Sequence, residues 1–163
     1  MEIITIPCLQ DNFAYLLICK KTLDAAVVDP SEAIPIQKAV KQKGVKLKAI
    51  LNTHHHWDHV GGNKDLVLEN PDLLIFGHES DRGRIPEQNV FLKKGDTVCF
   101  GEEKGSFIHN PGHTSGAITY IFSNIAFTGD TLFAAGCGRI FEGTPAQMYN
   151  SMIRHLKNLP DDT

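Results

Sequence analysis

The segment from Thr53 to His59, THHHWDH, is the most informative part of this sequence. It contains the pattern H-x-H-x-D-H, and it follows an apolar run that predicts a strand over 47–51. A loop at a strand end can aim alternate side chains into one cavity. We therefore expect His54 and His56 to share one metal ion, and Asp58 and His59 to turn toward a second. Imidazole and carboxylate ligands suit zinc, iron or manganese, so the ligand types do not determine which metal binds.

Chance is the alternative explanation for this cluster. The chain has 8 histidines, and surface histidines can pick up a metal ion adventitiously. That interpretation is disfavoured, because the ligand-type residues crowd together directly after an apolar strand. His55 lies among them, and we expect it to point away and to have no ligand role. The histidines outside the motifs are interpreted as structural or surface residues: His78, His109 and His155.

Two further segments place a ligand-type side chain at a predicted strand end. The first, NPGHTSG from Asn110 to Gly116, carries His113 in a glycine-rich turn. The second, FTGDT from Phe127 to Thr131, carries Asp130. Either residue alone would more often be structural than catalytic. Because both follow an H-x-H-x-D-H loop in this order, we predict that they belong to the same metal site.

The order of these three motifs resembles the metallo-β-lactamase superfamily. A longer stretch, GCGRIFEGT from Gly136 to Thr144, is similar to the glyoxalase II (hydroxyacylglutathione hydrolase) family within it. The resemblance covers most of the chain from Asn12 onward. It implies an αββα sandwich, an α/β fold in which two mixed sheets pack face to face, helices lie outside and the metals sit at one edge.

The resemblance also implies roles for individual residues. Two divalent ions, most simply zinc, would be held by a shared set of side chains: His54, His56, Asp58, His59, His113 and Asp130. The first ion would be bound by the histidines at 54, 56 and 113, the second by Asp58 and His59, and Asp130 would bridge both. Asp58 and Asp130 would take part in catalysis. Arg139 corresponds to a basic position that contacts glutathione, and Phe141 to an aromatic position beside the substrate.

The implied reaction is hydrolysis of a glutathione thioester, S-D-lactoylglutathione, to D-lactate and glutathione. Two ions that share Asp130 can hold a hydroxide, because metal binding lowers the pKa of water toward ~7, and this hydroxide would attack the thioester carbonyl. Asp58 would orient the nucleophile or receive its proton. The alternatives are another enzyme on this fold, such as a persulfide dioxygenase or a β-lactamase, and a fragment that binds metal weakly and is inactive.

The sequence departs from the glyoxalase II pattern near its C-terminus. The family adds one more histidine to the second metal and then a helical region that holds much of the glutathione. Both would lie beyond Thr163, so we expect residues 1–163 to form one incomplete catalytic domain. The complete enzyme is expected to be a monomer. Ala117 is a smaller departure, since many relatives have histidine there, but this position is not a metal ligand.

Composition and charge indicate which binding partners and which cellular compartment to expect. The chain has 42% hydrophobic and 21% charged residues, with 16 basic and 19 acidic side chains and a net charge of −3, which is typical of one globular domain. No basic stripe indicates nucleic-acid binding, and no apolar stretch is long enough to span a bilayer. The N-terminus lacks a signal-peptide pattern, and the 4 cysteines form no C-x-x-C pair. These features predict a cytoplasmic enzyme, and the resemblance implies that its partner is a small molecule, a glutathione thioester.

Short apolar segments predict many strands and few helices. Strands are expected over 3–6, 13–18, 25–28, 47–51, 73–76, 97–100, 106–109, 117–122 and 125–128. One helix is expected to begin with Ser31 as its N-cap and to stop at Gly44, and a short helix is expected over 63–69. The segment TPAQ from Thr144 is a capping box with proline at the first helical position. It predicts a last helix with one apolar face: Met148, Met152, Leu156 and Leu159.

Overall fold

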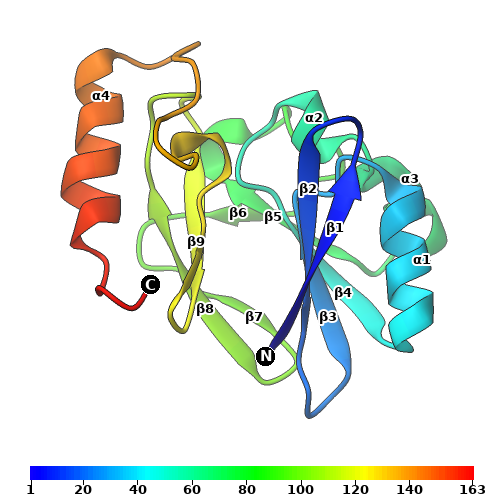
Figure 1. Ribbon diagram of the computed structural model, residues 1–163. Helices are drawn as coiled ribbons and strands as arrows, with labels where there is room; N and C mark the ends of the chain where they lie inside the picture. The colour runs from blue at the N-terminus through cyan, green and yellow to red at the C-terminus, as the bar shows by residue number, and fades with distance from the viewer.

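A computed structural model describes residues 1–163 of the chain (Figure 1). Two sheets packed face to face form the centre of the molecule. The first sheet has six strands in sequential order: β1 (Glu2–Cys8), β2 (Asn12–Ile18), β3 (Asp24–Val28), β4 (Lys46–Leu51), β5 (Leu74–His78) and β6 (Val90–Leu92). The second has four strands in the order β10 (Ile125–Phe127), β9 (Ile118–Phe122), β8 (Glu103–His109) and β7 (Val98–Phe100). Pairing in the first sheet is antiparallel from β1 to β3 and parallel from β3 to β6, so this sheet is mixed.

The central strands of the first sheet are apolar on both faces. Successive side chains of a strand point to opposite sides, so Leu16 and Val27 join one buried cluster while Leu17 and Val28 join another. The second of these clusters also contains Ile118 and other residues of the second sheet, so it fills the space between the sheets. A sheet that is covered on both faces needs such continuous apolar strands.

Helices cover the outer face of the first sheet. α1 (Ala33–Lys43) and α3 (Asn63–Glu69) lie on that side in Figure 1, and Ile36 and Leu66 are buried against its strands. α1 ends at Gly44, whose φ of 63° is the left-handed conformation predicted for a C-cap. The predicted N-cap is wrong, because Glu32 is the N-cap residue and makes no side-chain cap bond. The Ser31 hydroxyl instead donates to the backbone carbonyl of Asp58.

The last helix covers the outer side of the second sheet (Figure 1). α4 (Pro145–Tyr149) begins with the predicted capping box, in which Thr144 and Gln147 each bond the other's backbone N–H. It continues through a wider π-helical segment (Asn150–His155) and a 3₁₀ turn (Leu156–Asn158). Met148 is buried and lies against Gly112, where an added Cβ would be 2.9 Å from the Met148 Cα. The helix therefore supports the turn that carries His113.

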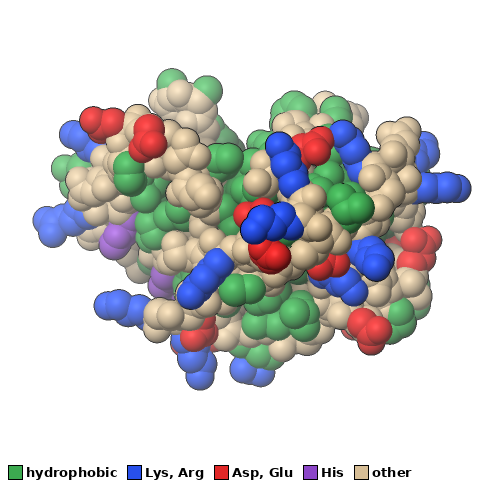
Figure 2. Space-filling model, turned by 90° about the horizontal axis from the view of Figure 1, so that it is seen from below, with side chains coloured by type: hydrophobic (Ala, Val, Ile, Leu, Met, Phe, Trp, Pro, Cys, Tyr) green, Lys and Arg blue, Asp and Glu red, His purple; other side chains and the backbone are tan.

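The αββα architecture confirms the predicted fold, but only the first of the two sheets is mixed, because all pairings in the second sheet are antiparallel. Acidic and basic side chains are interspersed on the face in Figure 2, with hydrophobic side chains gathered between them. None of the helices combines the length and the apolar composition that a membrane span requires. The segments that carry the candidate site lie at the ends of β4, β8 and β10, where both sheets contribute loops.

Candidate metal centre

Three loops at the strand ends supply the predicted metal ligands. The chain leaves β4 into the loop with His54 and His56, and the short helix α2 (Trp57–Val60) then carries Asp58 and His59. The turn between β8 and β9 carries His113, and the 3₁₀ turn after β10 (Gly129–Thr131) carries Asp130. Ligand-type side chains from both sheets therefore meet at one edge of the sandwich.

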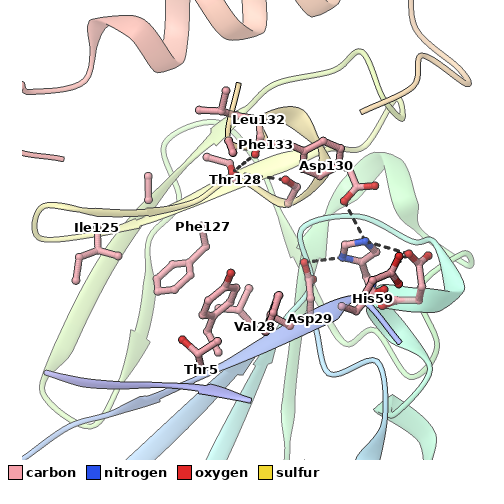
Figure 3. A pocket seen from close by; sticks show the side chains of 18 of the residues that line it. Thr5, Val28, Asp29, His59, Ile125, Phe127, Thr128, Asp130, Leu132 and Phe133 are labelled. Carbon is pink, nitrogen blue, oxygen red and sulfur yellow. Dashed lines mark hydrogen bonds and ion pairs between the residues drawn. The ribbon is translucent and has the colours of Figure 1, made fainter. Parts of the chain in front are cut away.

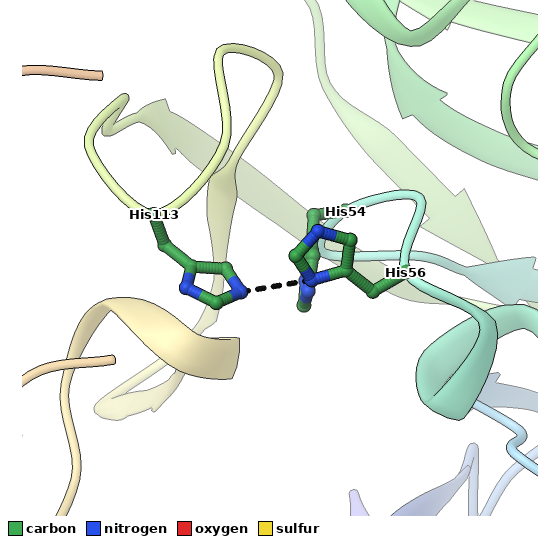
Figure 4. Close-up of side chains that lie close together, drawn as sticks. All are labelled: His54, His56 and His113. Atoms are coloured by element: carbon green, nitrogen blue, oxygen red, sulfur yellow. Dashed lines mark hydrogen bonds between the residues drawn. The ribbon is translucent and has the colours of Figure 1, made fainter. Parts of the chain in front are cut away.

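The first group consists of His54, His56 and His113, which point toward one another in Figure 4. One nitrogen of each ring lies within 4.8 Å of the others. The Nδ1 atom of His113 is 2.6 Å from the carbonyl oxygen of Arg139, so it donates there and leaves Nε2 free as a ligand. That Nε2 atom lies 3.0 Å from His56 Nδ1. The three free nitrogens can share one metal ion.

The second group consists of His54, His59 and Asp130, again within 4.8 Å of one another. The Nδ1 atom of His59 donates to Asp29 over 2.9 Å, and its Nε2 atom faces Asp130 Oδ1 at 3.2 Å (Figure 3). The other Asp130 oxygen lies 3.3 Å from Nε2 of His113. Asp130 thus belongs to the second group and also reaches His113 of the first, which is the position that a bridging ligand would take.

Asp58 lies beside these groups and belongs to neither. Its Oδ2 atom is 3.5 Å from Nε2 of His59, and it accepts a hydrogen bond of 3.2 Å from the side-chain amide of Asn12. Its role as a ligand of the second metal ion therefore stays a prediction. His55 points away from both groups, as expected, and its Nδ1 atom lies 3.0 Å from Asp81.

The donor atoms fit divalent metal ions. His54 has a buried Nε2 atom with no hydrogen-bond partner, although buried polar atoms are almost always paired. The buried Nε2 atom of His59 faces the carboxylates of Asp58 and Asp130. Burial and the neighbouring imidazoles hold the pKa of His54 well below its usual range, so its ring is neutral, which is the form that binds metal. Burial would lower the pKa of His59, but Asp29 and Asp130 outweigh it and raise that pKa to about 10. A metal ion must therefore displace a proton from His59.

Asp29 is a functional residue that the sequence interpretation missed. It follows β3 with a φ of 47°, is buried, and accepts hydrogen bonds from the Thr53 amide at 2.7 Å and from the Thr53 hydroxyl at 2.6 Å. It also orients His59, and through Thr53 it orients His54, whose Nδ1 atom is 3.0 Å from Thr53 Oγ1. Such partners fix the tautomer of a metal-binding histidine. A carboxylate directly after an apolar strand was the available signal.

Two glycines allow the loops to approach closely. Gly129 has a φ of 50°, and a side chain there would collide with Thr53. A side chain at Gly138 would collide with the carbonyl oxygen of Asp130 and come within 2.9 Å of His113 Nδ1. Contact between loops therefore requires glycine at position 129 of the FTGDT segment and at position 138 of the GCGRIFEGT segment.

The two residues predicted to bind substrate, Arg139 and Phe141, lie beside the first group of histidines. The Phe141 ring meets the rings of His56 and His113 edge-on, with centroids 5.3 Å apart in each case, and the side chain is 58% exposed. The guanidinium carbon of Arg139 lies 5.2 Å from the centre of the Phe141 ring. An aromatic surface and a positive charge thus lie together beside the histidines.

A cavity of about 760 Å³ opens on the side of the second group (Figure 3). Asp58, His59 and Asp130 line its polar end. Its other walls are largely apolar and come from both sheets, with Phe127 on β10 and Tyr15 on β2. The cavity can admit a substrate of mixed polar and apolar character.

The class of protein follows from this combination of fold and ligand loops. The family model described as Metallo-beta-lactamase superfamily matches residues 12–163, and the chain belongs to this superfamily. Within it, the chain is 51% identical over 170 residues to a protein of Rippkaea orientalis (strain PCC 8801 / RF-1) named hydroxyacylglutathione hydrolase. All of this chain is aligned, and it spans 66% of the length of that relative.

Solved structures show the same fold. The BLEG-1 B3 metallo-beta-lactamase superposes with a TM-score of 0.87 at 23% identity, over 98% of this chain and 87% of that one. A di-iron-bound form of TTHA1623 has a TM-score of 0.76 at 27% identity, over 99% of this chain and 88% of that one. Similarity of fold leaves the reaction open, because this fold serves several chemistries.

Proposed function

We propose that this chain is the metal-binding catalytic part of a hydroxyacylglutathione hydrolase, which hydrolyses S-D-lactoylglutathione to D-lactate and glutathione. The position of Asp130 between the two groups, 3.2 Å from one histidine nitrogen and 3.3 Å from another, carries the proposal. A carboxylate in that position suits a pair of metal ions. The name of the 51% identical relative and the GCGRIFEGT stretch support the thioester substrate.

Two divalent ions, zinc, iron or manganese, would be held by His54, His56, His59, His113 and Asp130, with Asp58 beside them. When bound, such ions supply Lewis acidity and lower the pKa of water toward ~7. The protein contributes the orientation of the ligands. Arg139 fixes the His113 ring through its carbonyl oxygen, and Asp29 fixes His59.

Asp58 is proposed to accept a hydrogen bond or a proton from the attacking water. Its carboxylate borders the cavity and is held by the Asn12 side chain at 3.2 Å. Because Asp58 lies outside both ligand groups, its oxygens are the carboxylate oxygens most available for this task. A positioned general base of this kind contributes typically about 10²–10⁴-fold to a rate.

Arg139 and Phe141 are proposed to bind the glutathione part of the substrate. Glutathione carries carboxylates, which a guanidinium binds through charge-assisted hydrogen bonds. The exposed Phe141 ring lies beside His56 and His113, so it can pack against the thioester while the carbonyl faces the ligand groups. For the complete protein, a cytoplasmic location and a monomeric state are predictions from the sequence.

The test is hydrolysis of S-D-lactoylglutathione by the purified chain, with the metal content per chain determined on the same sample. We expect turnover and two metal ions per chain. Asp130→Asn is expected to lose at least about 100-fold in rate and to bind fewer ions, since a bridging ligand is lost. Asp161→Asn, an exposed aspartate far along the chain, is the matched control.

Three results would contradict the proposal. Two bound ions without thioesterase activity would show that the site performs another reaction, and oxygen uptake with glutathione persulfide would then identify a dioxygenase. An unchanged rate in Asp130→Asn would remove its bridging role. No metal and no activity in the purified chain would favour an inactive fragment.

A further inference from the structure

A charged side chain, Arg84, links three loops of the candidate site. Arg84 lies in the turn after the 3₁₀ segment η1 (Glu79–Asp81), and its backbone amide bonds the Asp81 carbonyl at 2.8 Å. Its guanidinium forms an ion pair with both carboxylate oxygens of Glu142, in the loop that also carries Arg139 and Phe141. We call the set His55, Asp81, Arg84, Ser115 and Glu142 the Arg84 bridge.

The first connection of the Arg84 bridge is to the histidine loop. The second terminal nitrogen of Arg84 donates to His55 Nε2, and His55 Nδ1 then donates to Asp81 Oδ1 at 3.0 Å. Asp81 is fully buried, and its side chain packs against Gly116, where an added Cβ would collide with the carboxylate. His55 therefore serves as a hydrogen-bonding link, with its ring turned away from the ligand groups.

The second connection is to the turn that carries His113. Glu142 accepts hydrogen bonds from the Ser115 amide at 2.8 Å and from the Ser115 hydroxyl at 2.9 Å. The backbone of the loop that carries Phe141 also bonds the His113 turn: the amide of Phe141 donates to the His113 carbonyl at 3.1 Å. The Glu142 carboxylate is thus shared between Arg84 and the His113 turn.

We infer that Arg84 and Glu142 are positioning residues, which hold the loop of Arg139 and Phe141 against the His113 turn and so fix both side chains for binding the glutathione half of the substrate. The inference rests on the proposed function for its substrate. Its structural part, the anchoring of the loop, is independent of that function.

An ordinary surface ion pair would not have this effect. Exposed pairs contribute little because solvent screens them and two long side chains must be ordered. Lys21 and Glu102 form such a pair, with side chains 76% and 57% exposed and a single contact of 2.8 Å. Arg84 and Glu142 are 35% and 27% exposed, pair in a bidentate manner and bond further partners on both sides. Fork-like pairing of this kind gives geometric specificity as well as energy.

The first experiment measures amide hydrogen exchange of the full chain without substrate. In Glu142→Gln and in Arg84→Met, peptides that cover Ser115 and the 138–143 loop are expected to exchange at least about tenfold faster than in the unmodified chain, because local opening becomes easier. Peptides from β2 and β4 should be unchanged. Lys21→Met, which removes the exposed pair, is the matched control and should leave all these rates unchanged.

The second experiment separates substrate binding from turnover with S-D-lactoylglutathione. Both variants are expected to raise KM about tenfold with kcat within about threefold, since they disturb residues that bind the remote part of the substrate. Arg84→Lys keeps the charge without the fork and should fall between Arg84→Met and the unmodified chain. Metal content per chain should stay the same.

The outcomes are distinguishable from failure of the proposed function. Unchanged exchange in the 138–143 loop of both variants would overturn the anchoring. Faster exchange with a loss of kcat alone, or with a loss of metal, would overturn the role in substrate positioning. If the unmodified chain has no thioesterase activity, the proposed function fails, whereas the exchange result still decides whether the Arg84 bridge anchors the loop.

Discussion

Asp29 shows how one buried carboxylate can orient the side chains of a candidate metal site without belonging to either ligand group. It accepts hydrogen bonds from the Thr53 amide, the Thr53 hydroxyl and the His59 ring, so two proposed ligands depend on it. Its φ of 47° is one that asparagine also tolerates. Asp29→Asn therefore changes the charge and the hydrogen bonding with little change in backbone strain.

We expect Asp29→Asn to weaken Zn²⁺ binding about 10-fold or more, as the loss of a partner behind a ligand typically does. The dissociation constant would be measured by competition with a chromophoric chelator. Asp72→Asn, at an exposed position, is the control and should bind as the unmodified chain does. Equal affinities for Asp29→Asn and the unmodified chain would show that Thr53 and His59 are oriented without it.

Glu142 is expected to give stability a specific pH dependence. The hydrogen bond from Arg84 outweighs partial burial and lowers the pKa of Glu142 from 4.5 to about 2. Because the unfolded carboxyl takes up its proton first, the contribution is present above pH 4.5 and is lost as the pH falls toward 2. We expect Glu142→Gln to be less stable at pH 7 by about 1 kcal/mol, allowing for solvent screening, and this difference to vanish near pH 2. Urea unfolding of the metal-free proteins between pH 2 and pH 7 measures this difference in stability. A difference that does not change with pH would show that the charge of Glu142 makes no contribution and that only the shape of its side chain matters.

The strands and loops differ in how far the sequence predicts them. Each predicted strand exists, within one to three residues at its ends, because apolar alternation is local information. The capping box at Thr144 is equally local and is present. β6 (Val90–Leu92) was not predicted. Ser31 was wrongly predicted as an N-cap, since its hydroxyl bonds a carbonyl 27 residues away.

The residues of the candidate site likewise divide into those that the sequence predicts and those that it does not. The motifs placed His54, His56, His59, His113 and Asp130 in one site, and the structure brings them together. The sequence marks Asp29 as a carboxylate after an apolar strand, but it does not show which residues Asp29 and Arg84 bond, because Asp29 reaches Thr53 across 24 residues and Arg84 reaches Glu142 across 58. Such contacts depend on the packing of complete elements.

The loop from Leu132 to Thr144 offers a direct test of close packing between elements. Gly138→Ala would place a methyl group against the carbonyl oxygen of Asp130 and 2.9 Å from His113 Nδ1, so two ligand loops must move apart. We expect a loss of about 2 kcal/mol in the free energy of unfolding, together with weaker Zn²⁺ binding. Gly136→Ala, in the same loop, has nothing within 4 Å of the added carbon and is the matched control. If both variants behave alike, the close approach at Gly138 has no energetic importance.

The two halves of the sandwich meet directly beneath the site. Tyr120 of β9 is fully buried, and its hydroxyl donates to the carbonyl of Asn52 at 2.9 Å, at the end of β4. The amide of Ile118 similarly donates to the Thr53 carbonyl at 2.9 Å. The second sheet is therefore fixed to the segment that begins the histidine loop, so the ligands from the two sheets have a defined separation.

Metal binding should consequently stabilise the whole molecule. His54, His56 and His59 follow β4 of the first sheet, whereas His113 and Asp130 follow strands of the second, so a bound ion joins the two sheets. An ion that binds the folded chain alone stabilises it by about 2.7 kcal/mol at 100 times its dissociation constant. We expect Zn²⁺ to raise Tm in thermal unfolding of the chelator-treated chain, with a smaller effect in His113→Ala, which retains only the ligands of the first sheet and Asp130. Mg²⁺, which prefers oxygen ligands, is the control ion and should have little effect. A Tm that does not respond to Zn²⁺ would show that the ligand loops of the two sheets do not bind one ion together.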